Sequence, residues 1–246
     1  MHNFFIKKEN FIGDKVKIDG ADFNHIKNVL RMKKGEQFLV SFEGWSSLCE
    51  LDSFENDFVL ANVIEQGFQD TSLPIDLYLF QGLPKSDKLE LVIQKAVELG
   101  AHQIIPVQME RCIAKIEGNK VKQKTERFNS IAESSAKQSK RTIIPKVSEP
   151  LSFKNALEFA KELDLLLIPY ENEQGILSTK DALSKIKKGD KVGVLIGPEG
   201  GFSPSEIDLA RQVGISISLG KRILRTETAS ITALSMLMLH AEINLE

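Results

Sequence analysis

Five short apolar runs follow one another after Pro74 and constrain the fold more than any other feature of the chain. They span residues 75–80, 104–107, 165–168, 192–196 and 215–219. Runs of this length without polar alternation are typical of strands buried on both faces of a parallel sheet. Segments with helical periodicity lie between or after them, at residues 87–99, 128–140, 152–163, 205–214 and 228–244. Strands that alternate with helices predict an α/β domain.

The first of these helical segments has the clearest signals. Its apolar residues share one face: Leu89, Val92, Ile93, Ala96 and Val97. The segment Asp87-Lys-Leu-Glu90 has the spacing of a capping box, in which two side chains satisfy backbone amides of the first turn. Gly100 is a typical helix stop. We therefore expect a helix over residues 87–99.

The chain before Pro74 has a different rhythm. Short strand-like segments separated by turn glycines predict a small β-barrel, with strands at residues 15–18, 37–42, 47–51 and 58–64. One helix is expected over residues 22–32, and its buried stripe would hold Phe23, Ile26, Val29 and Leu30. The polar stretch 67–73 is a predicted linker. The sequence thus predicts two domains, residues 1–70 and 74–246.

Composition and charge limit the classes of function. Hydrophobic residues make up 42% and charged residues 27%, as in soluble globular proteins. The longest apolar run, residues 231–239, is too short to cross a bilayer. Two distant cysteines, Cys49 and Cys112, favour a reducing cytoplasm. Residues 111–146 hold ten basic against three acidic side chains, which indicates either a surface for a polyanion or a solvated helix face.

A glycine-rich turn follows the fourth apolar run, in Ile196-Gly-Pro-Glu-Gly-Gly-Phe-Ser203. Its glycines would let backbone amides approach a ligand closely. Ser203 and Glu206 have the spacing of a capping box for the next helix. The turn lacks the spacing of dinucleotide or P-loop phosphate sites. Taken alone, it is slightly better explained as a tight strand-to-helix connection.

A polar turn follows the fifth run, in Leu219-Gly-Lys-Arg-Ile-Leu-Arg-Thr-Glu-Thr-Ala229. Ligands of open α/β sheets sit beyond the carboxyl ends of the strands, so we expect this turn and the glycine-rich turn to share one crevice. A helix start explains some of its residues: Thr226 or Thr228 as the cap, and Glu227 near the positive end of the helix dipole.

Three cations at the same helix start are not explained in this way. They are Lys221, Arg222 and Arg225. Positive charge is unfavourable at a helix N-terminus. Their clustering predicts that an anionic group lies nearby.

The two turns together resemble the signature pair of the RsmE family, the 16S ribosomal RNA methyltransferases that modify N3 of uridine 1498. The matching segments are Gly197-Pro-Glu-Gly-Gly-Phe-Ser203 and the polar turn that follows the fifth run. Further matches are Leu83-Pro-Lys-Ser-Asp-Lys-Leu-Glu90, Gln94-Lys-Ala-Val-Glu-Leu-Gly100, Glu110-Arg111, and His25 with Val29-Leu30-Arg31 and Gly35. The resemblance covers nearly the whole chain. One departure is Lys137, where the family usually has an acid.

The resemblance implies an architecture that periodicity alone does not reveal. Members have an N-terminal PUA-like β-barrel and a C-terminal SPOUT domain with a parallel sheet and a deep trefoil knot, and they are homodimers. They hold the cofactor S-adenosyl-L-methionine in loops after three adjacent strands. Here these predicted cofactor loops are residues 168–171 (first), 196–201 (second) and 219–224 (third). The implied cofactor-binding residues are Ile168, Pro169, Tyr170, Glu171, Ile196, Gly197, Pro198, Glu199, Gly200, Gly201, Leu219, Gly220, Ile223 and Leu224.

The implied reaction needs negative charge on the uracil ring to be stabilised and its N3 proton to be accepted. Arg225 is expected to do the first, because a guanidinium can donate two hydrogen bonds to a delocalised anion. Glu227 is a candidate general base. A role as dipole complement, or as the ion-pair partner of Arg222, is favoured over it.

Binding to 16S rRNA in the small ribosomal subunit would need further contacts. The candidates are Lys27, Arg31, Lys33, Lys34, Arg111, Gln138, Lys140 and Arg141. Each alone is better explained as a solvated surface residue. The four histidines lack metal-ligand spacing, so no metal is expected. Two alternatives stay open: a non-enzymatic ribosome-assembly protein that binds RNA, and a SPOUT methyltransferase acting on tRNA or a ribose 2′-hydroxyl.

Overall fold

The computed structural model describes residues 1–68, 70–173 and 175–245. The chain forms two compact units. The first unit is Met1–Ser72 with Ala136–Ile144, and the second unit is Leu73–Ser135 with Pro145–Glu246. Residues 136–144, which lie inside the predicted 74–246 domain, thus group with the first unit. Gln69 of the predicted linker lies outside the described residues.

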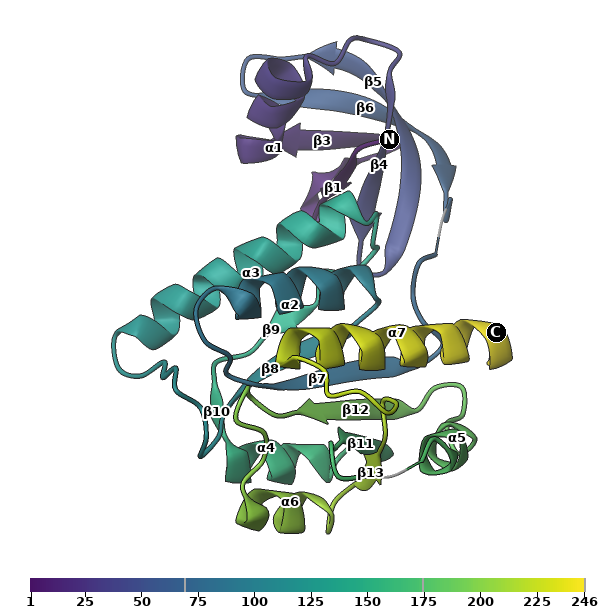
Figure 1. Ribbon diagram of the computed structural model, residues 1–246. Helices are drawn as coiled ribbons and strands as arrows, with labels where there is room; N and C mark the ends of the chain where they lie inside the picture. Colours follow the sequence, from purple (N-terminus) through teal and green to yellow (C-terminus); the bar gives the residue numbers. More distant parts are fainter. Residues whose placement is uncertain (69, 174, 246) are drawn as a thin grey trace. The chain divides into compact units, whose positions relative to one another are not determined.

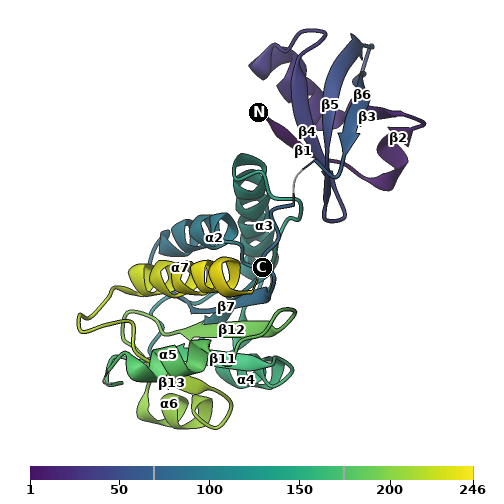
Figure 2. The ribbon, with the colours of Figure 1, turned by 90° about the vertical axis from the view of Figure 1, so that its right-hand side faces the viewer.

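Six strands form one curled sheet in the first unit, over the described residues. In chain order they are β1 (Asn3–Phe5), β2 (Phe11–Ile12), β3 (Lys15–Asp19), β4 (Gln37–Phe42), β5 (Trp45–Phe54) and β6 (Phe58–Gln66). Their spatial order is β1-β4-β5-β6-β3-β2 (Figures 1 and 2). β1 runs parallel to β4 and the other pairs are antiparallel. All four predicted strands are present, and β1 and β2 lie outside those four ranges.

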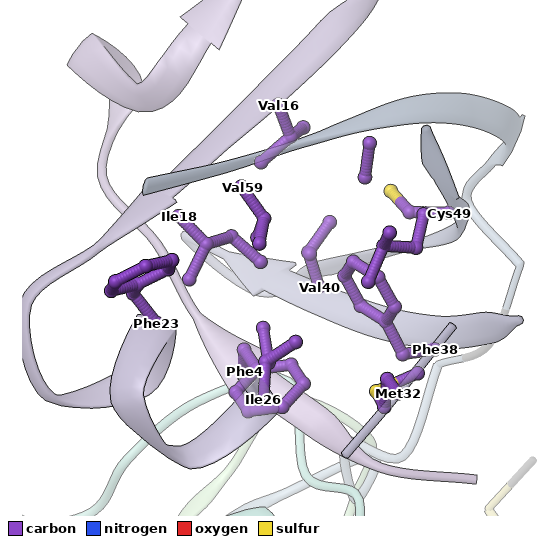
Figure 3. Close-up of a cluster of buried hydrophobic side chains, with 12 residues drawn as sticks. Phe4, Val16, Ile18, Phe23, Ile26, Met32, Phe38, Val40, Cys49 and Val59 are labelled. Atoms are coloured by element: carbon purple, nitrogen blue, oxygen red, sulfur yellow. The ribbon is translucent and has the colours of Figure 1, made fainter. Parts of the chain in front are cut away.

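The core of the first unit lies inside this curled sheet. Figure 3 shows Phe4 from β1, Phe38 from β4 and Ile26 packed among aliphatic side chains. Phe4 and Phe38 meet edge to face with their ring centroids 5.5 Å apart, an arrangement that aromatic pairs favour. Burial of these large side chains is what holds so small a sheet together.

The helix expected at residues 22–32 differs from the prediction in one respect. It is a short α1 (Gly20–Asn24) that continues as a π-helix, η2 (His25–Leu30), and ends at Arg31 in the left-handed region with φ 53°. Phe23 and Ile26 are buried as expected, but Val29 is 69% exposed. The prediction for Val29 was wrong because a π-helix has a wider turn than an α-helix. The 3.6-residue spacing therefore does not hold over this segment.

Seven strands form a parallel sheet in the second unit, over the described residues. They are β7 (Asp76–Gly82), β8 (Gln103–Gln108), β9 (Lys146–Val147), β10 (Leu151–Ser152), β11 (Leu165–Pro169), β12 (Lys191–Ile196) and β13 (Ile215–Ile217). The order is β10-β8-β7-β12-β11-β13, with β9 paired to β8. The five predicted runs are all strands of this sheet, which confirms the α/β class. Strand order does not define how a chain is threaded, so the trefoil knot stays a prediction.

Helices cover this sheet. They are α2 (Lys88–Glu98), α3 (Lys120–Gln138), α4 (Phe153–Ala160), α5 (Leu177–Leu183), α6 (Pro204–Ala210) and α7 (Thr226–Asn244). α5 was not expected. α2 and α7 lie side by side in both ribbon views, and α7 also packs on β7 and β12 (Figures 1 and 2). This packing places the start of α7 beside the ends of those two strands.

The capping box predicted for α2 does not form. Asp87 is the N-cap residue, but its side chain makes no cap hydrogen bond. Glu90 instead accepts a hydrogen bond from Arg127 of α3 at 2.9 Å. Glu90 thus forms an ion pair with a neighbouring helix instead of a bond to the N-cap amide.

The capping box predicted for α6 is confirmed. The Ser203 hydroxyl accepts from the Glu206 amide at 3.3 Å, and a Glu206 carboxylate oxygen accepts from the Ser203 amide at 2.9 Å. The other Glu206 oxygen accepts from the Glu110 amide at 2.8 Å. The start of α6 is thus also an anchor for the segment after β8.

Replacing Ser203 with alanine should lower the unfolding free energy by about 1 kcal/mol, the usual loss for an N-cap serine. For a chain of this size, that loss lowers the melting temperature by about 2–4 °C. Scanning calorimetry measures the shift. Ser130→Ala is the control, because Ser130 is an exposed serine inside α3 whose hydroxyl donates to the Glu126 carbonyl of the same helix. An equal shift in both variants would contradict the capping role.

Candidate active site

Three loops of the second unit line a single cavity of about 440 Å³. They follow β11, β12 and β13, which are neighbours in the parallel sheet, so their carboxyl ends meet at one edge. The structure therefore brings the glycine-rich turn and the polar turn together, as the strand pattern predicted. Of the residues expected to bind the cofactor, all but Ile168 and Gly200 line the cavity. Ile168 is buried inside β11, and Gly200 lies against Arg111.

The second predicted cofactor loop, residues 196–201, is tightly folded. Gly201 donates to the Pro198 carbonyl at 2.9 Å and has φ 66°, in the region that favours glycine. The loop packs directly on the end of β7. A Cβ on Gly82 would lie 2.7 Å from the Pro198 nitrogen and 2.7 Å from the Met109 sulfur. The absence of a side chain at Gly82 is therefore what lets the loop reach this position.

The third predicted cofactor loop, residues 219–224, has an open backbone. Gly220 has φ 107°, and a Cβ added there would meet nothing within 4 Å. Thr179 of α5 anchors the strand end before it, by donating to the Ser218 carbonyl at 2.7 Å and accepting from the Ser218 amide at 3.1 Å. Ile223, one of the implied cofactor-binding residues, lines the cavity but is 84% exposed. Leu219 and Leu224 are more enclosed.

The first predicted cofactor loop, residues 168–171, contributes an aromatic wall. Tyr170 meets Phe202 edge to face, with the ring centroids 6.3 Å apart. The Arg211 guanidinium lies 5.3 Å from the centre of the Tyr170 ring, within the range of a cation–π contact. Tyr170 is thus fixed on two sides where it borders the cavity.

The start of α7 differs from the expected capping arrangement. Arg225 is the N-cap residue, so neither Thr226 nor Thr228 is the cap. The Thr226 hydroxyl donates instead to the Gly197 carbonyl at 2.7 Å and accepts from the buried Gln81 amide at 3.0 Å. It therefore connects α7 to the second predicted cofactor loop. A cap and a tertiary bond look alike in sequence, because both need only a hydroxyl near a helix start.

The three cations before α7 all line the cavity and are exposed. Across residues 1–68, 70–173 and 175–245, none of Lys221, Arg222 and Arg225 has a carboxylate within 4.0 Å. Their charges are not neutralised by neighbouring acids in this part of the chain. This arrangement favours an anionic ligand at the mouth of the cavity.

Lys88, at the start of α2, pairs with two acids at the cavity. Its ammonium lies 3.1 Å from a Glu199 oxygen and 3.3 Å from Oε2 of Glu227. Of the two roles expected for Glu227, the ion pair with Arg222 is wrong, because Glu227 pairs with Lys88 instead. The hydrogen bond from Lys88 to Glu199 is the main cause that raises the lysine pKa. Burial alone would raise the pKa of Glu199, but its backbone bonds and Lys88 outweigh burial and lower it.

Arg111, a candidate for RNA contact, holds the second predicted cofactor loop. Its guanidinium donates to the Gly200 carbonyl at 3.0 Å. The neighbouring Cys112 is buried, and burial raises the pKa of its thiol. A buried thiol of this kind behaves as a small apolar side chain rather than a nucleophile.

Most other RNA candidates lie on the surface of the first unit. Lys27, Arg31, Lys33, Gln138 and Lys140 are exposed. Lys34 is exposed and pairs with Asp52 at 3.1 Å. Arg141 is different, since it is only 8% exposed and burial lowers its pKa to about 10. Its burial does not support a direct contact with RNA. Lys137 pairs with Asp22 at 2.9 Å.

Several residues in the cavity or next to it have a role that the sequence did not reveal. Lys88 lies within a segment that resembles the family, but nothing in its spacing points to the acids it meets. Phe202 and Ser218 also line the cavity. Gln81 had no signal at all, because a single polar residue at the end of an apolar run is ordinary.

Other classes of site find no support in the described residues. No group of three or more histidine, cysteine or acidic side chains is placed to hold a metal ion there. No helix among them is both long and apolar enough to span a bilayer.

Comparison with known proteins gives a consistent result. Residues 71–238 match the RNA methyltransferase domain family, and residues 18–45 match the RNA methyltransferase PUA domain family. The chain is 41% identical to the ribosomal RNA small subunit methyltransferase E of Bacillus subtilis, over 92% of this chain and 90% of that protein. It is 34% identical to the protein of the same name from Mesomycoplasma hyopneumoniae, over 96% and 98%. The Neisseria gonorrhoeae enzyme of that name, solved bound to S-adenosyl methionine, superposes with a TM-score of 0.82 at 26% identity, over 97% of each chain.

Proposed function

The chain belongs to the ribosomal RNA small subunit methyltransferase E family, and from this premise we propose that it methylates N3 of uridine 1498 in 16S ribosomal RNA. It is a methyltransferase that uses S-adenosylmethionine and acts on ribosomal RNA. The observation that supports the proposed target is a cavity whose floor is backbone and aliphatic and whose mouth holds three cations without carboxylate partners among the described residues. A neutral adenosyl group suits the floor, and an RNA strand suits the mouth.

The cavity fits the cofactor on three grounds. Its volume, about 440 Å³, lies in the range of small-molecule sites. Gly220 presents an open backbone to it. Ile196, Leu219 and Leu224 supply apolar walls. We propose that backbone groups of the three predicted cofactor loops hold the adenosyl part, while Glu171 and Glu199 favour a cationic sulfonium electrostatically. When bound, the cofactor supplies an electrophilic methyl group.

The chain's own residues have two tasks in the reaction. Arg225, at the mouth, would donate hydrogen bonds to the uracil oxygens and stabilise their negative charge. Glu227 is the candidate proton acceptor, because its Oε2 is buried and has no hydrogen-bond partner among the described residues, although Lys88 lies 3.3 Å away. A carboxylate in this position could take up the proton from N3.

The proposed substrate is testable by mapping modified nucleotides. Small-subunit RNA from cells that lack the protein should contain unmodified uridine at position 1498, and expression of the wild-type chain should restore N3-methyluridine there. Mass spectrometry of nuclease fragments measures both. Methylation of a transfer RNA or of a ribose hydroxyl would contradict the proposal. A wild-type chain without saturable heat on titration with S-adenosylmethionine would point to the non-enzymatic RNA binder.

The substrate also suggests partners and location. Exposed Lys27, Arg31, Lys33 and Lys140 are the proposed phosphate contacts, within the small subunit or its free RNA. We place the reaction in the cytoplasm, because two buried thiols, Cys49 and Cys112, suit a reducing compartment.

A homodimer is proposed from the exposed side of α7. Ala233, Leu234, Leu237 and Ala241 face the second unit's own core. Leu239 and Ile243 are large apolar side chains left exposed on the same helix, and Leu91 of α2 is exposed as well. A helix that is apolar around its whole circumference is normally buried on every side. A second copy of the chain would bury this face.

Leu239→Ala is expected to weaken the dimer by about tenfold, because burying a leucine side chain contributes about 1.5–3 kcal/mol and alanine loses most of it. Sedimentation equilibrium measures the change. Ile113→Ala is the control and should have no effect, because Ile113 is an exposed apolar residue outside α2 and α7. A wild-type chain that stays monomeric at all concentrations would refute the dimer.

A further inference from the structure

Gln81 is the most thoroughly bonded buried polar residue near the cavity. It is the penultimate residue of β7 and is 0% exposed. Its Nε2 donates to the Thr226 hydroxyl and to the Gly82 carbonyl, both at 3.0 Å. Its Oε1 accepts from the Ser230 hydroxyl. A buried carboxamide left without partners would destabilise the fold, so this full set of bonds fixes its orientation.

The orientation of Gln81 determines what Thr226 can do. A threonine hydroxyl has one proton to donate. Because Gln81 already donates to the Thr226 oxygen, the Thr226 proton is directed to the Gly197 carbonyl, at 2.7 Å. Gly197 belongs to the second predicted cofactor loop, and Thr226 is the first residue of α7. One buried amide thus connects β7, α7 and that loop, and it directs the Thr226 proton to the loop carbonyl.

We propose that Gln81 is a positioning residue for the cofactor cavity, acting through the Thr226 hydroxyl on the Gly197 carbonyl. Gln81 does not line the cavity, whereas Thr226 and Gly197 both do. The third predicted cofactor loop leads into α7. The network therefore holds the second predicted cofactor loop at a fixed distance from the first residue of α7. The inference rests on the proposed function only in naming S-adenosylmethionine as the ligand of this cavity.

Substitutions that change the hydrogen bonds but keep the side-chain shape can distinguish a positioning role from a role in packing. Gln81→Glu keeps the shape of the side chain but, when ionised, has no proton to donate. Thr226 would then donate to the new carboxylate and leave the Gly197 carbonyl without its partner. Thr226→Val removes the hydroxyl at constant shape, and Thr226→Ser restores it. Thr125→Val is the matched control, because the Thr125 hydroxyl is buried, has no hydrogen-bond partner among the described residues and lies in α3.

Calorimetric titration of each purified variant with S-adenosylmethionine tests the proposal, and filter binding with a small-subunit RNA fragment gives a second readout. Thr226→Val and Gln81→Glu should raise the cofactor Kd about tenfold and leave the RNA Kd within about twofold of wild type. Thr226→Ser should return the cofactor Kd to within about threefold, and Thr125→Val should not change it. The double variant, Gln81→Glu with Thr226→Val, should have a cofactor Kd no higher than that of the more affected single variant. Both substitutions break the same chain of hydrogen bonds, so their effects should not add.

Three results would overturn the proposal. The first is a folded Thr226→Val variant that binds the cofactor with wild-type affinity. The second is a Thr226→Ser variant that does not recover the affinity. The third is a double variant in which the two increases in cofactor Kd add. If Gln81→Glu does not fold, the two Thr226 variants decide the question alone. A wild-type chain that binds no S-adenosylmethionine would instead refute the proposed function, so the two failures are distinguishable.

Discussion

Replacing Arg225 with alanine is expected to lower kcat for RNA methylation by about 10²–10³-fold, the usual effect of removing one donor to a developing anion. Arg225 is exposed at the mouth of the cavity, and among the described residues no carboxylate neutralises it. Its charge is therefore available to the substrate. Single-turnover kinetics with saturating cofactor isolates the chemical step from binding.

Two further substitutions sharpen this prediction. Arg225→Lys keeps the charge but loses the planar pair of donors, so it should recover only part of kcat. Arg222→Ala removes a cation from the same loop and should weaken RNA binding with a smaller effect on kcat. Equal losses of kcat in Arg222→Ala and Arg225→Ala would show that general electrostatic attraction, rather than a specific contact, explains the result.

Replacing Gly82 with alanine is expected to lower kcat/KM by about 10²-fold, because small displacements of a site can have effects of that size. The new Cβ would lie 2.7 Å from the Pro198 backbone nitrogen, closer than any normal contact. The second predicted cofactor loop would have to move away from β7. Overpacking of this kind also destabilises a fold by about 1–3 kcal/mol.

The measurement needs a control for the alanine itself. Gly118→Ala adds a methyl group at φ 60° with no atom within 4 Å, so it should destabilise the chain slightly and leave the cofactor Kd unchanged. Calorimetry with S-adenosylmethionine and thermal unfolding should be run on both variants. Cofactor affinity at the wild-type level in Gly82→Ala would show that the loop tolerates the shift.

Sequence patterns predicted the sheet of the second unit well, because buried parallel strands have an unmistakable signal. All five predicted runs are strands, and their order along the sheet brings two distant turns to one cavity. Sequence patterns were less informative where the same residue type at the same position fits two different interactions. Thr226 fits a helix cap and a tertiary hydrogen bond equally, and only the position of Gly197 decides between them.

Contacts between charged side chains were the least predictable feature. Lys88 and Glu227 are far apart in sequence, and no local rule links them. The same holds for Arg141, whose charge favoured the surface although its side chain is buried. Val29 failed for a different reason, since the helical period itself changed in η2. Each miss lies where tertiary packing or backbone geometry outweighs local preference.

The division of the chain into units has a consequence for proteolysis and truncation. Residues 136–144 belong to the first unit, where the Arg141 carbonyl accepts hydrogen bonds from Asn3 at 3.0 Å and Ser41 at 3.4 Å. The chain therefore leaves the first unit at the linker, returns to it at residue 136 and leaves it a second time after residue 144. A nick at residues 67–73 would leave both fragments associated through this segment, and a gene truncated to residues 74–246 would expose backbone groups that normally have partners.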